Sequence, residues 1–316
     1  MSPAHGHRKI QRRTSLTAFL ALLFFGFLGP QPKAFSKEGA ESRVLLKKLK
    51  QKSYEEVETV TDAELRAKSG SQSKWSLSGS LSYYGPSVDR LDSEIKPNPE
   101  NTAMEVRTSV SGSVSARYRF SSSMSLSMYS GLSFYTPLSG AQDGEMNDPG
   151  LTLGHLHRFF GLQMSSRYSA ALTTSNYYRN KGQLGRLNMS HDIKRKIGGS
   201  ESQWLWSVGS SFNWYLFERA YNRDGKVSNY HLSVYPGLQY NIQDGFFVGS
   251  SLAFAYSNLR EEPNWWNWDR RLWSQRLTFG YAFTRDVFFS PYLNFYPEQF
   301  EWKTTSANLN LYLNLF

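Results

Sequence analysis

Two histidines have the type and spacing that metal binding would use. His155 and His157 are two positions apart, so on an extended strand both imidazoles lie on one face. Imidazole nitrogens are common Zn²⁺ ligands, and His191 is a possible third. Because no carboxylate cluster accompanies them, we interpret these histidines as rim or interface residues. We therefore expect no metal site and no cofactor.

His231 and Ser233 have a spacing that could place a general base beside a nucleophile. The pair superficially resembles the His-x-Ser-Asn-Gly pattern of the outer-membrane phospholipase, but Val234 and Tyr235 stand where Asn and Gly would be. Both residues fall on the polar face of their segment, whereas that enzyme works at its lipid-facing side. We find no convergent nucleophile, base and orienting acid, and expect no enzymatic activity.

Long basic side chains recur among small polar residues on the polar faces of alternating segments. Residues such as Ser109, Ser111 and Ser113 would leave room for water beside these bases. A mainly basic wall beside water attracts anions. Snorkelling at a rim or pairing with loop acids is the competing interpretation. The basic residues predicted to line the lumen are Arg107, Arg117, Arg119, Arg158, Arg167, Arg186, Lys194 and Arg276.

The segments that carry these side chains have the two-residue period of β-strands. In "KWSLSGSLSYY", Trp75, Leu77 and Leu81 lie on one side and serines on the other. This period predicts a strand with one apolar and one polar face. Comparable segments recur to the end of the chain, with weaker ones at 151–159, 164–175 and 184–196. They predict twelve strands, with ten or fourteen as alternatives because 151–196 is ambiguous.

The connections between the predicted strands alternate in length. Short turns are expected near 121–123, 160–163, 198–202, 243–245 and 284–286, and longer loops at 85–104, 136–150, 176–183, 218–228, 257–270 and 297–303. Short turns at one end and long loops at the other are typical of transmembrane barrels with an even strand number. The predicted fold is all-β, an antiparallel up-and-down transmembrane β-barrel over 74–316 with both termini on the short-turn side.

The N-terminal part of the chain is organised differently. Basic residues, an apolar run of about 14 residues and small residues near Ser36 predict a secretory signal peptide over 1–36. Its five basic residues account for half of the net charge of +10, so the basic balance does not predict nucleic-acid binding. Residues 37–73 are predicted to form a polar, partly helical periplasmic extension. Its acidic part, 53–65, is expected either to dock against basic residues at the periplasmic mouth or to remain a disordered leader.

The signal peptide, the alternating strands and their aromatic ends together resemble a bacterial outer-membrane β-barrel protein of porin-like type. The resemblance implies a Gram-negative outer membrane, both termini in the periplasm, and contact with lipid and lipopolysaccharide. In that class the terminal strand resembles the signal read by the barrel-insertion machinery, here with Tyr312 and Phe316 as candidates. Phe316 departs from the pattern because it is out of phase with the apolar residues Leu313 and Leu315.

A soluble β-sandwich or lipocalin-like barrel is the alternative fold. In a water-soluble barrel the apolar face points inward and must be filled. Here that face is rich in Trp, Phe and Tyr, and 16% of the chain is aromatic. The opposite face is mostly Ser, Gly and Asn, which would make a surface with little charge. We therefore expect the apolar face to point outward, to lipid.

The loop "EEPNWWNWDRR" is the most distinctive candidate for surface binding. Trp265, Trp266 and Trp268 could stack on sugars or anchor a partner, or could pack over the barrel rim. The sequence favours a narrow passive channel for small polar or anionic solutes. A structural or adhesive surface barrel is the second hypothesis, and an outer-membrane hydrolase the third.

Overall fold

The computed structural model describes residues 73–100, 106–138, 143–159, 162–199, 201–218, 227–243, 245–261, 264–284 and 286–315. The predicted signal peptide at 1–36 lies outside these residues, as does the predicted extension except for Ser73.

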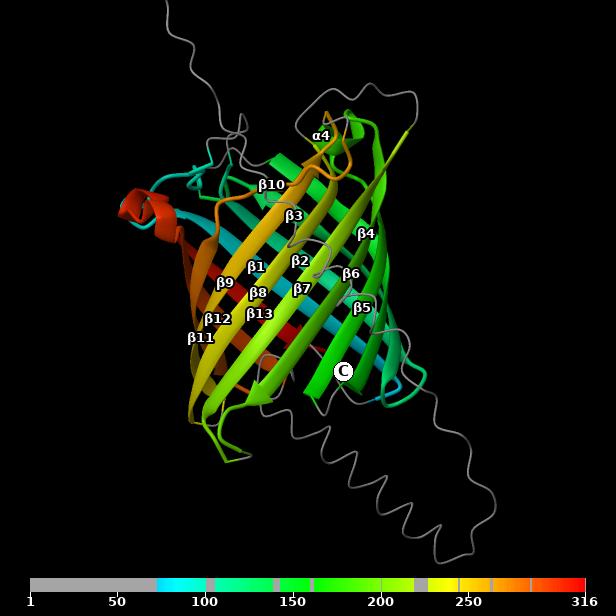
Figure 1. The fold of residues 1–316 in the computed structure, drawn as a ribbon, viewed down its shortest axis with the longest axis vertical. Helices are drawn as coiled ribbons and strands as arrows, with labels where there is room; N and C mark the ends of the chain where they lie inside the picture. The colour runs from blue at the N-terminus through cyan, green and yellow to red at the C-terminus, as the bar shows by residue number, and fades with distance from the viewer. Residues whose placement is uncertain are drawn as a thin grey trace, which may run out of the picture. The chain divides into compact units, whose positions relative to one another are not determined.

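The described residues form a closed antiparallel β-barrel (Figure 1). Its strands are β1 (Trp75–Ser87), β2 (Ser109–Arg119), β3 (Met124–Tyr135), β4 (Asp143–Phe159), β5 (Leu162–Leu172), β6 (Gln183–Lys196), β7 (Trp204–Phe217), β8 (Ser228–Gln243), β9 (Phe246–Leu259), β10 (Asp269–Arg270), β11 (Ser274–Ala282), β12 (Val287–Phe295) and β13 (Ser306–Asn314). Three short helical turns, α4 (Asn176–Arg179), η2 (Pro297–Gln299) and η3 (Trp302–Thr304), lie in the connections. Among the described residues, no helix has the length and apolar character needed to cross a membrane.

Strands β10 and β11 are two parts of one barrel strand, so the barrel has twelve strands as predicted. Both pair with β9, where Arg270 lies opposite Tyr256 and Ser274 lies opposite Ala253. Four steps along β10–β11 therefore match three along β9, which is the geometry of a β-bulge. The extra residue falls between 271 and 273 and interrupts the ladder there.

The barrel closes between its first and last strands. Every other strand pairs with its neighbour in sequence, and β1 pairs with both β2 and β13. Ser80 lies opposite Tyr312 and Ser82 opposite Asn310, so the terminal alternating segment completes the sheet. Closure leaves no unpaired edge, which is the condition for a β-sheet to span lipid.

The two ends of the barrel differ in their connections. Connections of two to seven residues join β2–β3, β4–β5, β6–β7, β8–β9 and β11–β12, and connections of seven to twenty-one residues join β1–β2, β3–β4, β5–β6, β7–β8, β9–β10 and β12–β13. The turn before β9 uses Gly245 at a φ of 84°, a conformation that other residues rarely adopt. We call these the short-turn end and the long-loop end. The chain enters β1 and leaves β13 at the short-turn end.

The strand β4 begins earlier than predicted. The expected loop at 136–150 is wrong in extent, because β4 starts at Asp143 and pairs with β3 from there. A bulge opposite Ser130 accommodates Asp148 and Pro149, since Tyr129 pairs with Gly150 and Gly131 with Asn147. The composition of this stretch, with Glu145, Asp148 and the pair Pro149-Gly150, is typical of a loop.

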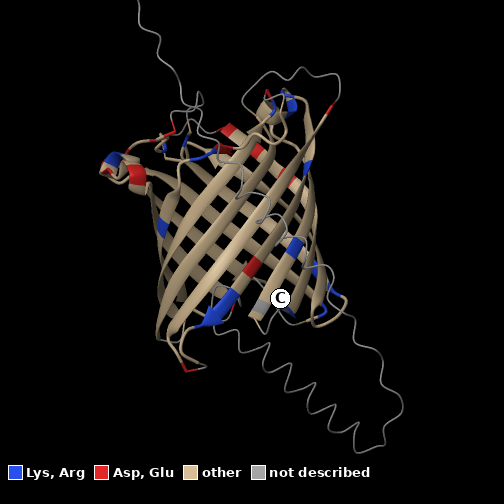
Figure 2. Cartoon of the chain, in the orientation of Figure 1, with Lys and Arg blue, Asp and Glu red and all other residues tan. Residues whose placement is uncertain are grey.

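Apolar side chains point outward and small polar side chains point into the lumen. On β2, outward Val114 is 54% exposed, and its neighbours Ser113 and Ser115 lie on the inner face. Inward Ser76 and Ser127 are buried. Figure 2 shows the charged residues gathered towards the two ends of the barrel, with the middle of the strands mostly uncharged. The sheet therefore has an apolar outer surface, as expected for a barrel surrounded by lipid.

Candidate functional site: the lumen of the barrel

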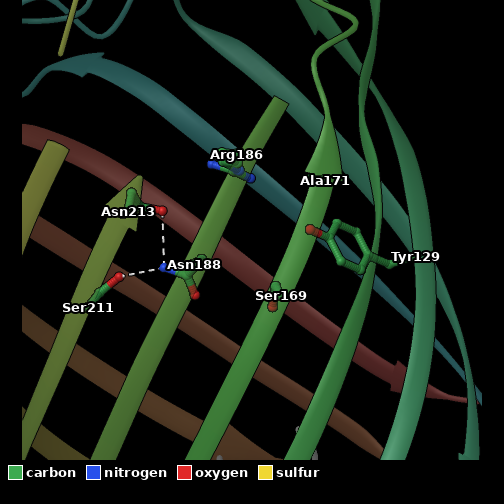
Figure 3. Close-up of a pocket in the computed structure, with 7 residues that line it drawn as sticks. All are labelled: Tyr129, Ser169, Ala171, Arg186, Asn188, Ser211 and Asn213. Carbon is green, nitrogen blue, oxygen red and sulfur yellow. Dashed lines mark hydrogen bonds between the residues drawn. The ribbon is translucent and has the colours of Figure 1, made fainter. Parts of the chain in front are cut away.

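The lumen has open space along the wall made by β3–β8. Two adjoining cavities of about 290 and 340 Å³ share Ser169, Asn188 and Ser211. Figure 3 shows the first, lined by Tyr129, Ser169, Ala171, Arg186, Asn188, Ser211 and Asn213. Most of these side chains donate or accept hydrogen bonds, so this wall can replace part of the water around a polar solute.

Asn188 is the hydrogen-bonding centre of this wall. Its amide nitrogen donates to Ser211 Oγ at 2.9 Å and to Asn213 Oδ1 at 3.0 Å (Figure 3). Arg186 lies two positions away on the same inward face and makes no ion pair within the described part of the chain. A guanidinium beside open space that forms no ion pair with a carboxylate attracts anions.

A basic cluster lies nearer the short-turn end. Arg117, Arg119 and Arg167 are close enough to interact electrostatically, and Arg117 Nε donates to Ser127 Oγ at 3.2 Å. Arg167 also forms an ion pair of 2.5 Å with Asp192, whose carboxylate partly neutralises the cluster. The strand register places Arg158 and Lys194 on inner faces at the same end.

The wall made by β11, β12, β13 and β1 carries a different set of side chains. The guanidinium of Arg276 lies 4.2 Å from the ring centroid of Tyr292. Lys96, from the first long loop, places its amino group 5.0 Å from the ring centroid of Tyr84. Burial lowers the pKa of Lys96, and the nearby positive charge of Arg276 lowers it further.

Glu100 anchors the first long loop to the long-loop end of the barrel between β10 and β11. One carboxylate oxygen accepts from Arg271 Nη1 at 3.1 Å and the other from the Leu272 backbone N–H at 2.7 Å. Arg271 and Leu272 belong to the bulge between β10 and β11. Burial and the charge of Glu100 raise the pKa of nearby Tyr296. Arg107, also at this end, pairs with Asp143 at 2.9 Å, and both side chains are exposed.

His231 and Ser233 are brought together, but the hydroxyl is not reachable. Ser233 Oγ lies 2.9 Å from His231 Nε2, and His231 Nδ1 lies 2.9 Å from Ser257 Oγ. Ser233 is only 1% exposed, and the third member is a hydroxyl in place of a carboxylate. This chain of hydrogen bonds continues through Arg271 Nε, 3.4 Å from Ser257 Oγ, and therefore supports the mouth.

His155, His157 and His191 lie on the outer face of the barrel. The rings of His155 and His157 stack at 4.6 Å, and His191 Nδ1 lies 2.8 Å from Ser166 Oγ on the strand next to β4. The described residues contain no group of three or more His, Asp or Glu arranged to hold a metal ion. The stacked pair thus faces away from the lumen cavities.

The three loop tryptophans separate into two environments. Trp265 and Trp266 are 59% and 54% exposed, with ring centroids 3.8 Å apart. The ring centroid of Trp268 lies 6.2 Å from that of Tyr230, so Trp268 packs against the start of β8. At the closing strand, Tyr312 lies on the inner face, 6.1 Å from Phe288, and Phe316 lies outside the described residues.

Comparison with known proteins identifies the architecture. No family model matches the chain, and no curated protein sequence matches it. The structure is similar to an outer-membrane channel from Pseudomonas putida F1, with 12% identity and a TM-score of 0.50, over 78% of this chain and 97% of that one. The chain has the fold of a porin-like outer-membrane β-barrel. The NanC porin is less similar, with 9% identity and a TM-score of 0.43 over 75% of this chain and 97% of that one. Salmonella typhi OmpF has 7% identity and a TM-score of 0.36 over 76% of this chain and 97% of that one.

Several lumen residues of this porin-like barrel were not singled out from the sequence. Asn188 could have been found, because it alternates in phase with Arg186 on β6. Phe247 and Phe288 each follow or precede another Phe, and in a period of two one ring of each pair must point inward. Glu100 gave no signal, since its partner Arg271 is 171 residues away.

Proposed function

We propose that this protein is a passive channel of the bacterial outer membrane that admits small polar solutes and prefers anions. The observation that carries the proposal is the lumen wall of β3–β8, where Arg186 lies beside open cavities lined by Ser, Asn and Tyr. A lumen of this kind offers water and hydrogen-bond partners along its length, and its fixed positive charges concentrate anions. The proposal assigns no catalytic role to the chain.

The membrane location is part of the same proposal. The outward leucines, valines and aromatic residues need an apolar surrounding, and both ends of the barrel sequence lie at the short-turn end. In outer-membrane barrels the short turns face the periplasm. We accordingly propose a secretory signal over 1–36, periplasmic termini, insertion by the barrel-assembly machinery, and lipid and lipopolysaccharide as neighbours.

Recordings from purified protein in planar bilayers test the proposal. A KCl gradient should give stepwise conductance with a reversal potential of the sign set by chloride, because the lumen is mainly basic. Arg186→Gln should move the reversal potential towards that of an unselective pore. Arg270→Gln is the matched control, since Arg270 is exposed at the long-loop end and already paired with Glu298 at 3.0 Å. Absence of conductance from a folded barrel would refute the channel.

A further inference from the structure

The wall opposite the cavities is filled at its short-turn end by packed aromatic rings. Phe288 is fully buried and Phe247 is 3% exposed. Their ring centroids lie 6.0 Å apart with planes at 14°, and Tyr312 lies 6.1 Å from Phe288. Ala282 completes this group, which we call the lumen aromatic cluster.

The register places the cluster inside the barrel. Phe288 pairs with Tyr312 on β13, which in turn pairs with Ser80 on β1, and Ser80 is on the polar inner face. Phe247 pairs with Gly280. A Cβ at position 280 would lie 2.2 Å from Phe247 Cε1, so glycine there makes the room that the ring occupies. Outward Phe246 and Phe289 contact other outer-face rings instead.

The first long loop covers the same side of the lumen at the long-loop end. Lys96 reaches the inner face of β1 at Tyr84, and Glu100 reaches the bulge between β10 and β11. Strands β13 and β12 lie between β1 and β11 in the sheet, and Glu100 is also close enough to Tyr296, which follows β12, to interact with it electrostatically. Side chains therefore fill both ends of one side of the lumen: the lumen aromatic cluster at the short-turn end and the first long loop at the long-loop end. This side is formed by β9, β11, β12, β13 and β1.

We propose that the conducting path is off the barrel axis, along the β3–β8 wall, and that the lumen aromatic cluster sets its width. This inference rests on the proposed channel function and adds the route and its size-determining residues. Bulky rings stand on one side, while Ser169, Ser211 and Asn188 leave space on the other. A solute on this route meets Arg186 and then the Arg167–Asp192 pair, which suits compact, hydrogen-bonding anions better than wide or apolar molecules.

Thiol accessibility tests the route, because the chain contains no cysteine and each introduced thiol is the sole target. We expect Ser169→Cys and Ser211→Cys to react readily with a charged methanethiosulfonate reagent added to the folded barrel in detergent. Ser290→Cys is the matched control, since Ser290 is 3% exposed on the inner face of the filled side. Mass spectrometry measures the reaction without any need for conductance. Equal reaction rates at the two walls would overturn the proposed path.

Channel recordings test the width. Phe288→Ala should raise the single-channel conductance, because it removes a ring that fills the lumen, and Phe288→Leu should raise it less. Phe279→Ala is the control, since Phe279 is 46% exposed on the outer face and should leave conductance unchanged. Heat-modifiable gel migration establishes that each variant is folded. Unchanged conductance in folded Phe288→Ala and Phe288→Leu would overturn the role of the cluster.

The two measurements also separate this inference from the channel itself. A wild-type barrel that never conducts would refute the proposed function, while the thiol contrast between Ser169 and Ser290 would still decide whether the open space follows the β3–β8 wall. A conducting barrel with equal thiol reactivity at both walls would keep the channel and refute the off-axis path.

Discussion

Asp192 places a negative charge among the basic residues of the inner lumen. Its ion pair with Arg167 is partly exposed, with side-chain exposures of 33% and 44%, so we expect at most about 1 kcal/mol of stability from it. Its larger effect is on the charge that a passing ion meets. Asp192→Asn should increase anion preference, seen as a reversal potential closer to that of chloride.

Asp143, an acid at the long-loop end, provides the comparison for Asp192. Asp143 also pairs with an arginine, Arg107, but its side chain is 76% exposed and its charge is screened by salt. Asp143→Asn should therefore change the reversal potential less than Asp192→Asn does. Equal effects of the two substitutions would contradict a selectivity set inside the lumen.

The position of Lys96 predicts a pH dependence for the proposed channel. Burial and Arg276 lower its pKa from the ordinary value of 10.5, so it loses its charge at a lower pH than an exposed lysine would. Below the lowered pKa the charge is present, and it is lost as pH rises through that value. Anion preference should then fall as pH rises through the lowered pKa of Lys96. In the same interval the fold should gain stability, because the unfolded chain binds the proton that the folded state releases.

Substitution by arginine isolates this contribution. Lys96→Arg keeps a positive charge at the mouth throughout the alkaline range, since guanidinium does not titrate there. Reversal potentials measured across that range should fall in the wild type and stay nearly constant in Lys96→Arg. The same decline in both proteins would show that another group is responsible.

At the scale of the strand, alternation assigns each residue to lipid or to water. Val114 and Ser113 are neighbours on β2, and Val114 points outward. Val114→Arg should destabilise the barrel by about 2–4 kcal/mol, the cost of a basic side chain near the membrane midplane. Ser113→Arg, with its side chain in the lumen, should cost less. Urea unfolding in lipid vesicles measures both, and an equal cost would contradict the assigned faces.

The alternation also explains which elements the sequence could predict. A period of two was enough to place twelve strands and the face that carries Arg186. The alternation did not predict the start of β4, because the residues around Pro149 have the composition of a loop. In the structure β4 includes them through a bulge. The alternation could not predict how the first long loop is anchored, since the Glu100–Arg271 contact joins chain segments far apart in sequence.

For the same reason the sequence predicted the basic residues of the lumen but not its open and filled regions. Basic residues on inner faces were predicted one by one, because each follows from the phase of its own strand. The distribution of open and filled space depends on how several strands meet, as with Phe247 against Gly280 or Phe288 against Tyr312. Pairs of consecutive aromatic residues such as Phe246-Phe247 could have revealed the filled region. Because successive side chains of a strand point to opposite faces, one ring of each pair must enter the lumen.

At the scale of the whole barrel, closure makes the fold all-or-none. The strand β13 pairs with β12 on one side and β1 on the other, so ending the chain after Thr305 would leave two open edges. Each unpaired backbone group in hydrocarbon costs several kcal/mol. Such a truncated chain should lose the heat-modifiable, compact form on gels.

A conservative change in the same strand separates closure from side-chain effects. Asn310→Ser removes the 2.8 Å hydrogen bond from Ser82 but keeps every backbone pairing of β13. The substituted chain should retain heat-modifiable migration after refolding in detergent, while the truncated chain should not. A truncated chain that still migrates as a compact species would mean that eleven strands can close, and the terminal strand would then serve insertion more than closure.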